Sequence, residues 1–158
     1  MEDIKEAYER LMQSEAFCTG EKGEDSYLSS FSLMAETNKL EAAKWQIDYF
    51  SPSAGKMTSF LMKDIIEVRP DQAILGGGSK PIEMDAVKVE FKEAFAKAEA
   101  SLKSSLNETS QSIIAVLQNR NTHMWIITFI TTSMKVACIE IDAQTGDVIS
   151  EKAGSFTA

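Results

Sequence analysis

Four stretches in the last third of the chain are apolar at alternate positions, or apolar throughout, over lengths typical of β-strands. They hold the densest β-branched and aromatic content of the sequence, and short polar turns separate them. The pattern predicts four antiparallel strands joined by tight turns, over residues 113–118, 124–131, 134–142 and 147–150.

The first half shows a weaker form of the same pattern. In its clearest stretch Trp45, Ile47 and Tyr49 point to one side, whereas Gln46 and Asp48 point to the other. Such alternation is the mark of a strand with one buried face. We predict strands over residues 27–35 and 42–50, and either two further strands over 57–63 and 65–68 or one bent strand over both.

Two stretches repeat apolar residues every three or four positions, which predicts amphipathic helices over residues 3–13 and 84–106. The second carries an apolar stripe that includes Phe91, Phe95 and Leu102. Burial of each large stripe residue contributes about 1.5–3 kcal/mol, whereas each surface charge pair adds only about 0.2–0.5 kcal/mol. The stripe therefore predicts a helix that faces the core of this chain.

The two halves of the chain resemble each other in the order of their elements. Each begins with a helix and continues into strands, and the motifs Trp45-x-Ile47-x-Tyr49 and Trp125-x-Ile127-x-Phe129 share one parity. We therefore predict an α+β fold made of a duplicated unit, a helix packed on a curved antiparallel sheet. The expected division is a first repeat over 1–69, a linker over 70–82 and a second repeat over 83–158, with one compact domain as an alternative.

The strands of the second half are apolar on both sides. Behind Trp125 and Ile127 lie Ile126, Thr128 and Ile130, whereas an antiparallel sheet with one wet face should alternate. We expect the second helix to cover one face. The other face would be covered by the first helix and the first-half strands, by a second copy of the chain, or by a ligand.

The closing segment Ile139-Glu-Ile-Asp-Ala-Gln-Thr-Gly-Asp-Val-Ile resembles the terminal hairpin of PepSY and PepSY-like domains. The family pattern runs apolar-x-apolar-Asp-Ala-x-Thr-Gly-x-Val, and the helix and hairpin that precede it here are similar in order over residues 82–152. The resemblance implies a small α+β module of cystatin-like shape. It also implies a non-catalytic role, such as modulating or inhibiting a peptidase, or binding a peptide or ligand near a cell envelope.

Composition narrows the classes of partner. The chain of 158 residues has a net charge of −8, and such a surface repels nucleic-acid phosphates and anionic membranes. Its charged first residues are unlike a secretory leader, and no run approaches the ~18 apolar residues of a membrane span. We therefore expect a cytoplasmic protein in which Cys18 and Cys138 are free thiols.

No constellation of residues predicts catalysis, a cofactor or a metal. His123 is the single histidine and lies at a hairpin tip, and Cys138 lies inside an apolar strand. The acidic loop Glu21–Asp25 and the turn Asp142–Asp147 lack the oxygen spacing of a dedicated calcium loop. The segment Gly76–Lys80 lacks the spacing of a phosphate-binding loop, and a proline follows it.

The sequence favours a non-enzymatic binding or regulatory module whose partner is a protein, a peptide or a second copy joined through the C-terminal sheet. One rival is a small-molecule-binding protein or enzyme that uses a cavity between helix and sheet. A second rival is a structural subunit of a larger complex. Trp45 and Trp125 are expected in the core, with a recognition platform as the alternative.

Overall fold

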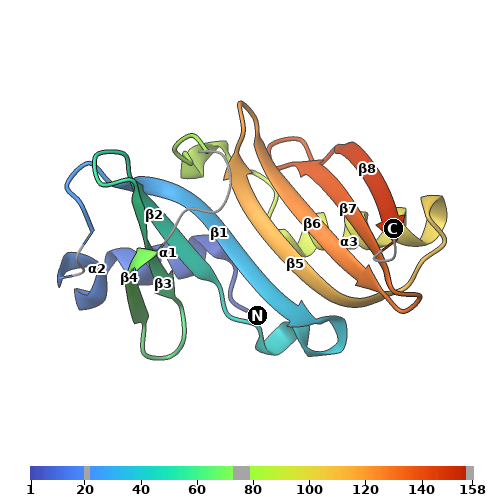
Figure 1. Cartoon of the computed structure of the whole chain (residues 1–158), viewed down its shortest axis with the longest axis horizontal. Helices are drawn as coiled ribbons and strands as arrows, with labels where there is room; N and C mark the ends of the chain where they lie inside the picture. The colour runs from blue at the N-terminus through green and yellow to red at the C-terminus, as the bar shows by residue number, and fades with distance from the viewer. Residues whose placement is uncertain (20–21, 73–78, 156–158) are drawn as a thin grey trace.

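The strands of both halves join in one antiparallel sheet. The computed structural model describes residues 1–19, 22–72 and 79–155. The strand order is β4-β3-β2-β1-β5-β6-β7-β8, so β1 and β5 lie side by side at the centre (Figure 1). The strands are β1 Tyr27–Glu36, β2 Gln46–Ser51, β3 Lys56–Leu61, β4 Glu67–Gln72, β5 Ser110–Asn119, β6 His123–Thr131, β7 Lys135–Asp142 and β8 Val148–Ser155.

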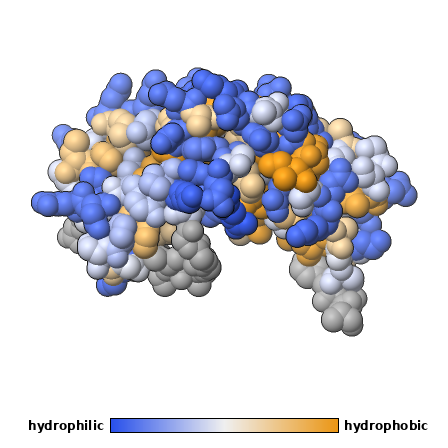
Figure 2. Space-filling view, turned by 90° about the horizontal axis from the view of Figure 1, so that it is seen from above, coloured by the Kyte–Doolittle hydropathy of each residue, from blue (hydrophilic) through white to orange (hydrophobic). Residues whose placement is uncertain are grey.

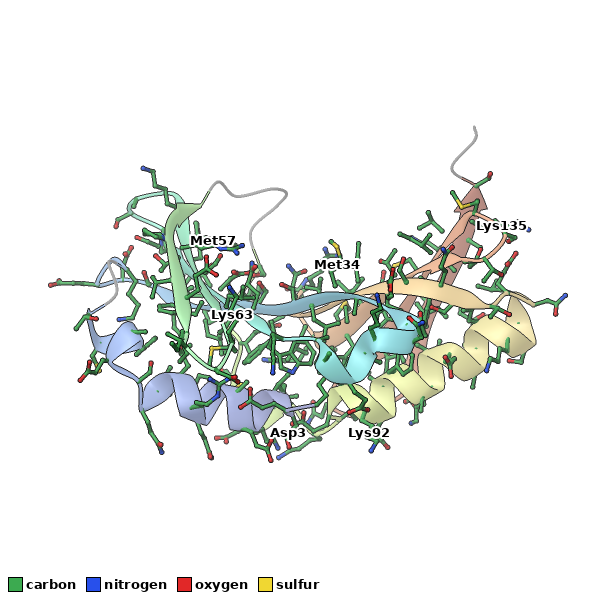
Figure 3. The ribbon with its side chains drawn as sticks, turned by 90° about the horizontal axis from the view of Figure 1, so that it is seen from below. Asp3, Met34, Met57, Lys63, Lys92 and Lys135 are labelled. Atoms are coloured by element: carbon green, nitrogen blue, oxygen red, sulfur yellow. The ribbon has the colours of Figure 1, made fainter. Side chains whose placement is uncertain are left out.

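The helices are short and lie on one side of the sheet. Figure 3 shows the sheet bent into a trough, with β1 and β5 in its floor, β3 and β4 rising at one end, and β7 and β8 at the other. We call the trough side, which faces away from α1 and α3, the outer face. The helices are α1 Ile4–Met12, α2 Glu15–Thr19, α3 Phe91–Ser105 and the 3-10 helices η1 Thr37–Ala42 and η2 Met84–Ala86.

The predicted fold class, a duplicated unit with a helix packed on a curved sheet, is wrong. Of the described residues, 43% lie in strands and only 26% in helices, and the strands of the two predicted units form a single eight-stranded sheet. The cause lies in β1 and β5, which are ten residues long and pair from Ser30–Gln118 to Glu36–Ser112. An unpaired strand edge leaves backbone groups without partners, and joining two such edges satisfies both.

The strand predictions hold well in the second half and less well in the first. Residues 42–45 are not a strand, because the 3-10 helix η1 ends at Ala42 and β2 begins at Gln46. β4 begins at Glu67 and continues to Gln72, into the segment proposed as a linker. Residues 73–78 of that segment, with the triple glycine, lie outside the described residues.

The second helix is shorter than predicted, because α3 begins at Phe91 and not at Met84. The backbone N–H groups of Lys88 and Val89 both donate to the carbonyl of Ala143, each at 2.9 Å, and this holds the chain out of the helix. The stripe itself is confirmed from Phe91 onward, since Phe91, Ala94, Ala98 and Leu102 are buried.

The two tryptophans occupy equivalent places in the two halves. The indole Nε1–H of Trp45 donates to the carbonyl of Glu2 at 2.9 Å, and that of Trp125 donates to the carbonyl of Val89 at 2.8 Å. Glu2 and Val89 each precede the N-cap residue of the helix in their own half. The two indole hydrogen bonds do not test the division at 1–69, 70–82 and 83–158, which stays a prediction.

The first helix is confirmed and begins at a capping box. The Asp3 carboxylate accepts from the backbone N–H of Glu6 at 2.8 Å, and the Glu6 carboxylate reaches back to the backbone of Asp3. These two bonds satisfy N–H groups that a helix start leaves unpaired. The opposite side of α1 buries Ile4, Ala7 and Leu11.

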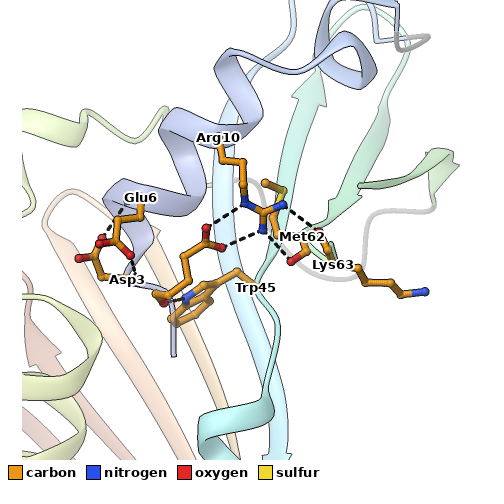
Figure 4. Close-up of polar contacts among 7 residues, drawn as sticks. Asp3, Glu6, Arg10, Trp45, Met62 and Lys63 are labelled. Carbon is orange, nitrogen blue, oxygen red and sulfur yellow. Dashed lines mark hydrogen bonds and ion pairs between the residues drawn. The ribbon is translucent and has the colours of Figure 1, made fainter. Parts of the chain in front are cut away.

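Arg10 ties α1 to the turn between β3 and β4 (Figure 4). Its Nε and Nη2 donate to the two carboxylate oxygens of Glu2, each at 2.9 Å. Nη1 donates to the carbonyl of Lys63 at 2.8 Å, and Nη2 also donates to that of Met62 at 2.9 Å. The hydrogen bond with Glu2 raises the pKa of Arg10. The planar guanidinium therefore binds the carboxylate before α1 and the two carbonyls after β3 at the same time.

Arg10→Lys should lower the free energy of unfolding by about 1–2 kcal/mol, because one ammonium cannot replace a bidentate fork and also reach both carbonyls. Urea titration followed by circular dichroism measures the loss. Arg120→Lys is the matched control, because Arg120 is exposed and donates from Nε to a single side chain, Gln118. Equal stability of Arg10→Lys and the wild type would contradict this role.

Candidate functional site

The outer face divides into an apolar and a polar part along the line where β1 meets β5. On β5, β6 and β7 the residues that share this face are mostly apolar and half-buried. Met34 of β1 lies beside them, is 73% exposed, and projects from the trough floor in Figure 3. We call the following residues the apolar patch: Met34, Ile114, Val116, Ile126, Ile130 and Val136.

No helix of the described residues lies over the apolar patch. The expectation that the first helix and the first-half strands cover the second face of this sheet is wrong, because α1 and α3 contribute to the same core on the opposite side. The first-half strands extend the sheet sideways and do not stack on it. Of the covers considered for this face, a second copy and a ligand remain.

The polar part of the outer face is centred on Asp48 of β2. Its Oδ2 accepts from the hydroxyl of Ser30 at 2.8 Å, and its Oδ1 accepts from Ser59 at 2.6 Å and from the amide of Gln46 at 3.0 Å. Asp48 is 7% exposed. A buried carboxylate with three donors is already satisfied, so this cluster stabilises the sheet and has little need of a ligand.

Sequence reasoning placed Gln46 and Asp48 on one polar side of a strand but missed their partners. Ser30 and Ser59 face Asp48 only because of the register of β1 and β3 against β2. The available signal was the three serines of residues 27–32, which are unusual in a strand next to a buried face, whereas residues 56–61 hold the single serine Ser59.

Aromatic rings fill the space between α3 and the sheet. Trp45, Phe91 and Trp125 are at most 2% exposed, and the centres of their rings lie 5.3 to 5.8 Å apart. The prediction that both tryptophans belong to the core is confirmed. These rings occupy the place where a small-molecule-binding protein or enzyme would need a cavity between helix and sheet.

A hollow of about 550 Å³ lies beside the first turns of α1 and α3, with Leu40, Phe95 and Glu90 in its wall. Glu90 is the N-cap residue of α3, and its Oε1 accepts from the backbone N–H of Ile4 at 3.1 Å. Its Oε2 is buried and has no hydrogen-bond partner among the described residues. Burial raises the pKa of Glu90 above its ordinary value.

Glu90→Gln should become more stable relative to the wild type as the pH rises. A raised folded-state pKa means that the folded protein holds this proton more tightly than the unfolded chain does. The stabilisation is therefore complete below the ordinary pKa of 4.5 and is lost as the pH rises through the folded-state pKa. Glutamine keeps the acceptor for Ile4 and cannot ionise.

Urea unfolding of both proteins from pH 4 to pH 8 measures this difference. Other titrating groups, including His123, are present in both proteins and cancel. A constant difference across the pH range would contradict the role of Glu90.

His123 and Cys138 are not brought together with any catalytic partner among the described residues. His123 Nε2 accepts from the backbone N–H of Glu83 at 2.9 Å, and burial lowers the pKa of the ring. The imidazole therefore joins the β5–β6 hairpin to the chain before η2 and is not a fully solvated turn residue. Cys18 is exposed and Cys138 is half-buried on the outer face, and both are free thiols.

The acidic segments considered for calcium do not form a site in the part of the chain that the structure describes. No group of three or more His, Cys, Asp or Glu side chains there could hold a metal ion. In the turn after β7, Asp142 Oδ1 accepts from the backbone N–H groups of Gln144 and Thr145. Glu21 and residues 76–78 of the glycine-rich segment lie outside the described residues.

Comparisons with known proteins bear on the fold alone. The sequence matches no model of a known protein family, and it matches no curated protein. The structure is similar to the crystal structure of "a putative lipoprotein" from Clostridium difficile 630. The two are 12% identical with a TM-score of 0.52, over 83% of this chain and 84% of that one.

The resemblance of residues 82–152 to PepSY domains stays a prediction, since none of these comparisons tests it. Within the described residues, no helix is long and apolar enough to cross a membrane.

Proposed function

We propose that this chain is a non-catalytic binding module and that its apolar patch is the binding surface for a segment of another polypeptide. The observation that carries the proposal is the patch itself: an apolar, half-exposed area across four neighbouring strands, with no described helix over it. Burial of a contiguous apolar surface of this kind by a partner removes it from water and stabilises the complex.

An open sheet face suits a polypeptide better than a small molecule. Small ligands usually bind in enclosed pockets that bury most of their surface, whereas protein partners use broad and shallow areas. No helix of the described residues crosses the trough (Figure 3), and its walls would limit the directions in which a segment can lie. The rigid floor of paired strands also lowers the entropy lost on binding.

Selection of peptides from a displayed random library on the immobilised protein tests this function. Peptides that bind should lose at least about tenfold in affinity for Met34→Glu, because the new carboxylate would be desolvated in an apolar contact. Ile65→Glu is the matched control. Ile65 is 86% exposed between β3 and β4, away from the patch, so this variant should bind like the wild type.

The two native cysteines give a second readout. Cys138 pairs with Thr128 beside the apolar patch, whereas Cys18 lies on α2 on the other side of the sheet. A bound peptide should slow the alkylation of Cys138 by iodoacetamide and leave that of Cys18 unchanged. Failure to enrich any peptide, or equal binding to Met34→Glu and the wild type, would contradict the proposal.

A cytoplasmic location belongs to this proposal as well. Two free thiols, one of them exposed on α2, suit a reducing compartment.

A further inference from the structure

The charge around the apolar patch is unbalanced. The strands of the outer face carry more carboxylates than cations. The whole chain has a net charge of −8. The carboxylates on the described strands of this face are Glu36, Asp48, Glu67, Glu140 and Asp142, and the cations are Arg69 and Lys152.

Two of these carboxylates border the apolar patch directly. Glu140 of β7 pairs with Ile126 of β6, and Glu36 lies two residues after Met34 on the same face of β1. The others already have partners: Asp48 accepts three hydrogen bonds, Glu67 pairs with Lys63 and Arg69, and Asp142 caps its turn. Within the described residues, the Glu36 carboxylate forms an ion pair with the exposed side chain of Lys39, and a surface pair of this kind is worth little.

A hollow of about 450 Å³ opens beside Glu36, where β1 ends and β5 begins. The hydroxyl groups of Thr37 and Ser110 hydrogen-bond across it at 2.6 Å. Its wall therefore offers one carboxylate surrounded by hydroxyl and amide oxygens, which are the acceptors that an ammonium or guanidinium group needs. The lining residues are Glu36, Thr37, Asn38, Ser110, Gln111 and Thr132.

We propose that the segment bound by the apolar patch is cationic, with apolar side chains on the patch and a Lys or Arg side chain in the hollow beside Glu36. This inference rests on the proposed function and names the chemistry of its partner. A second copy of the chain fits the surface poorly, because two chains of net charge −8 repel each other. The side of the molecule seen from above in Figure 2 is largely hydrophilic, with smaller hydrophobic areas among the hydrophilic residues.

Two matched displayed libraries test the inference on the full chain. Both present random apolar residues at alternate positions; the positions between hold Lys or Arg in one library and Asp or Glu in the other. Binders should come from the basic library, and their affinity, measured by fluorescence anisotropy, should weaken as NaCl rises from about 0.05 to 0.5 M. Glu36→Gln should reduce that affinity about fivefold or more, because it removes a charge-assisted hydrogen bond.

Glu9→Gln is the matched control and should leave the affinity unchanged, because Glu9 is exposed on α1 on the opposite side of the sheet. Binders that come equally from both libraries and are weakened by Met34→Glu would overturn the cationic inference and keep the proposed function. Binders that are insensitive to Met34→Glu, or an absence of binders, would overturn both. A dimer that Met34→Glu dissociates in sedimentation would overturn the inference in favour of a second copy.

Discussion

Trp125→Ala should lower the free energy of unfolding by about 3–5 kcal/mol, the range for removal of a fully buried large aromatic side chain. Trp125 is 0% exposed, and its ring lies 5.8 Å from that of Trp45 and 5.6 Å from that of Phe91. The change also leaves the carbonyl of Val89 without its donor. Equilibrium unfolding in urea measures the loss.

Trp125→Phe should lose less, because it keeps an aromatic ring and gives up only part of the volume and the indole N–H. Met134→Ala is the surface control, since Met134 is 61% exposed, and it should change stability by no more than about 0.5 kcal/mol. A loss below about 1 kcal/mol for Trp125→Ala, together with loss of peptide binding, would place this ring in a recognition surface and not in the core.

Asp48→Ala should cost about 2–3 kcal/mol of unfolding free energy, because it removes the common acceptor of three donors in a buried site. Two of those donors are serine hydroxyls, which can rotate toward other acceptors, and this keeps the cost below that of three separate hydrogen bonds. Asp48→Asn keeps one carbonyl oxygen and should be intermediate. Urea unfolding at pH 7 measures all three proteins.

Asp25→Ala is the matched control. The Asp25 carboxylate also accepts from serines, at 2.7 Å from the hydroxyl of Ser51 and 3.1 Å from that of Ser53, but it is exposed, and water can replace it as acceptor. Its loss should cost clearly less than the loss of Asp48. Equal effects of the two changes would show that burial does not determine the strength of the Asp48 cluster.

Local patterns were enough to find most elements of this fold. The alternation of Trp45, Ile47 and Tyr49 and the apolar runs after Ile113 predicted strands, because the side-chain period of a strand is set by its own backbone. The start of α3 escaped the same reasoning. The apolar spacing continues back to Met84, but the hydrogen bonds from Lys88 and Val89 to Ala143 come from another part of the chain.

The union of the two halves could not be seen in the sequence. It depends on the pairing of β1 with β5, whose partners, such as Phe31 and Leu117, are distant in the chain and leave no local mark. The candidate surface could be predicted only in part from the sequence. The apolar reverse side of β6 was plain in Ile126 and Ile130, but the position of α1 decides which face stays open, and that position is a tertiary property.

The central pairing of β1 with β5 also has a consequence for proteolysis. A cut between β4 and η2 would yield two fragments, each with its longest strand as a bare edge. Bare edges of that length invite pairing with any neighbouring chain. Fragments that stay paired through β1 and β5 would keep the sheet intact, whereas fragments that separate would be prone to aggregate.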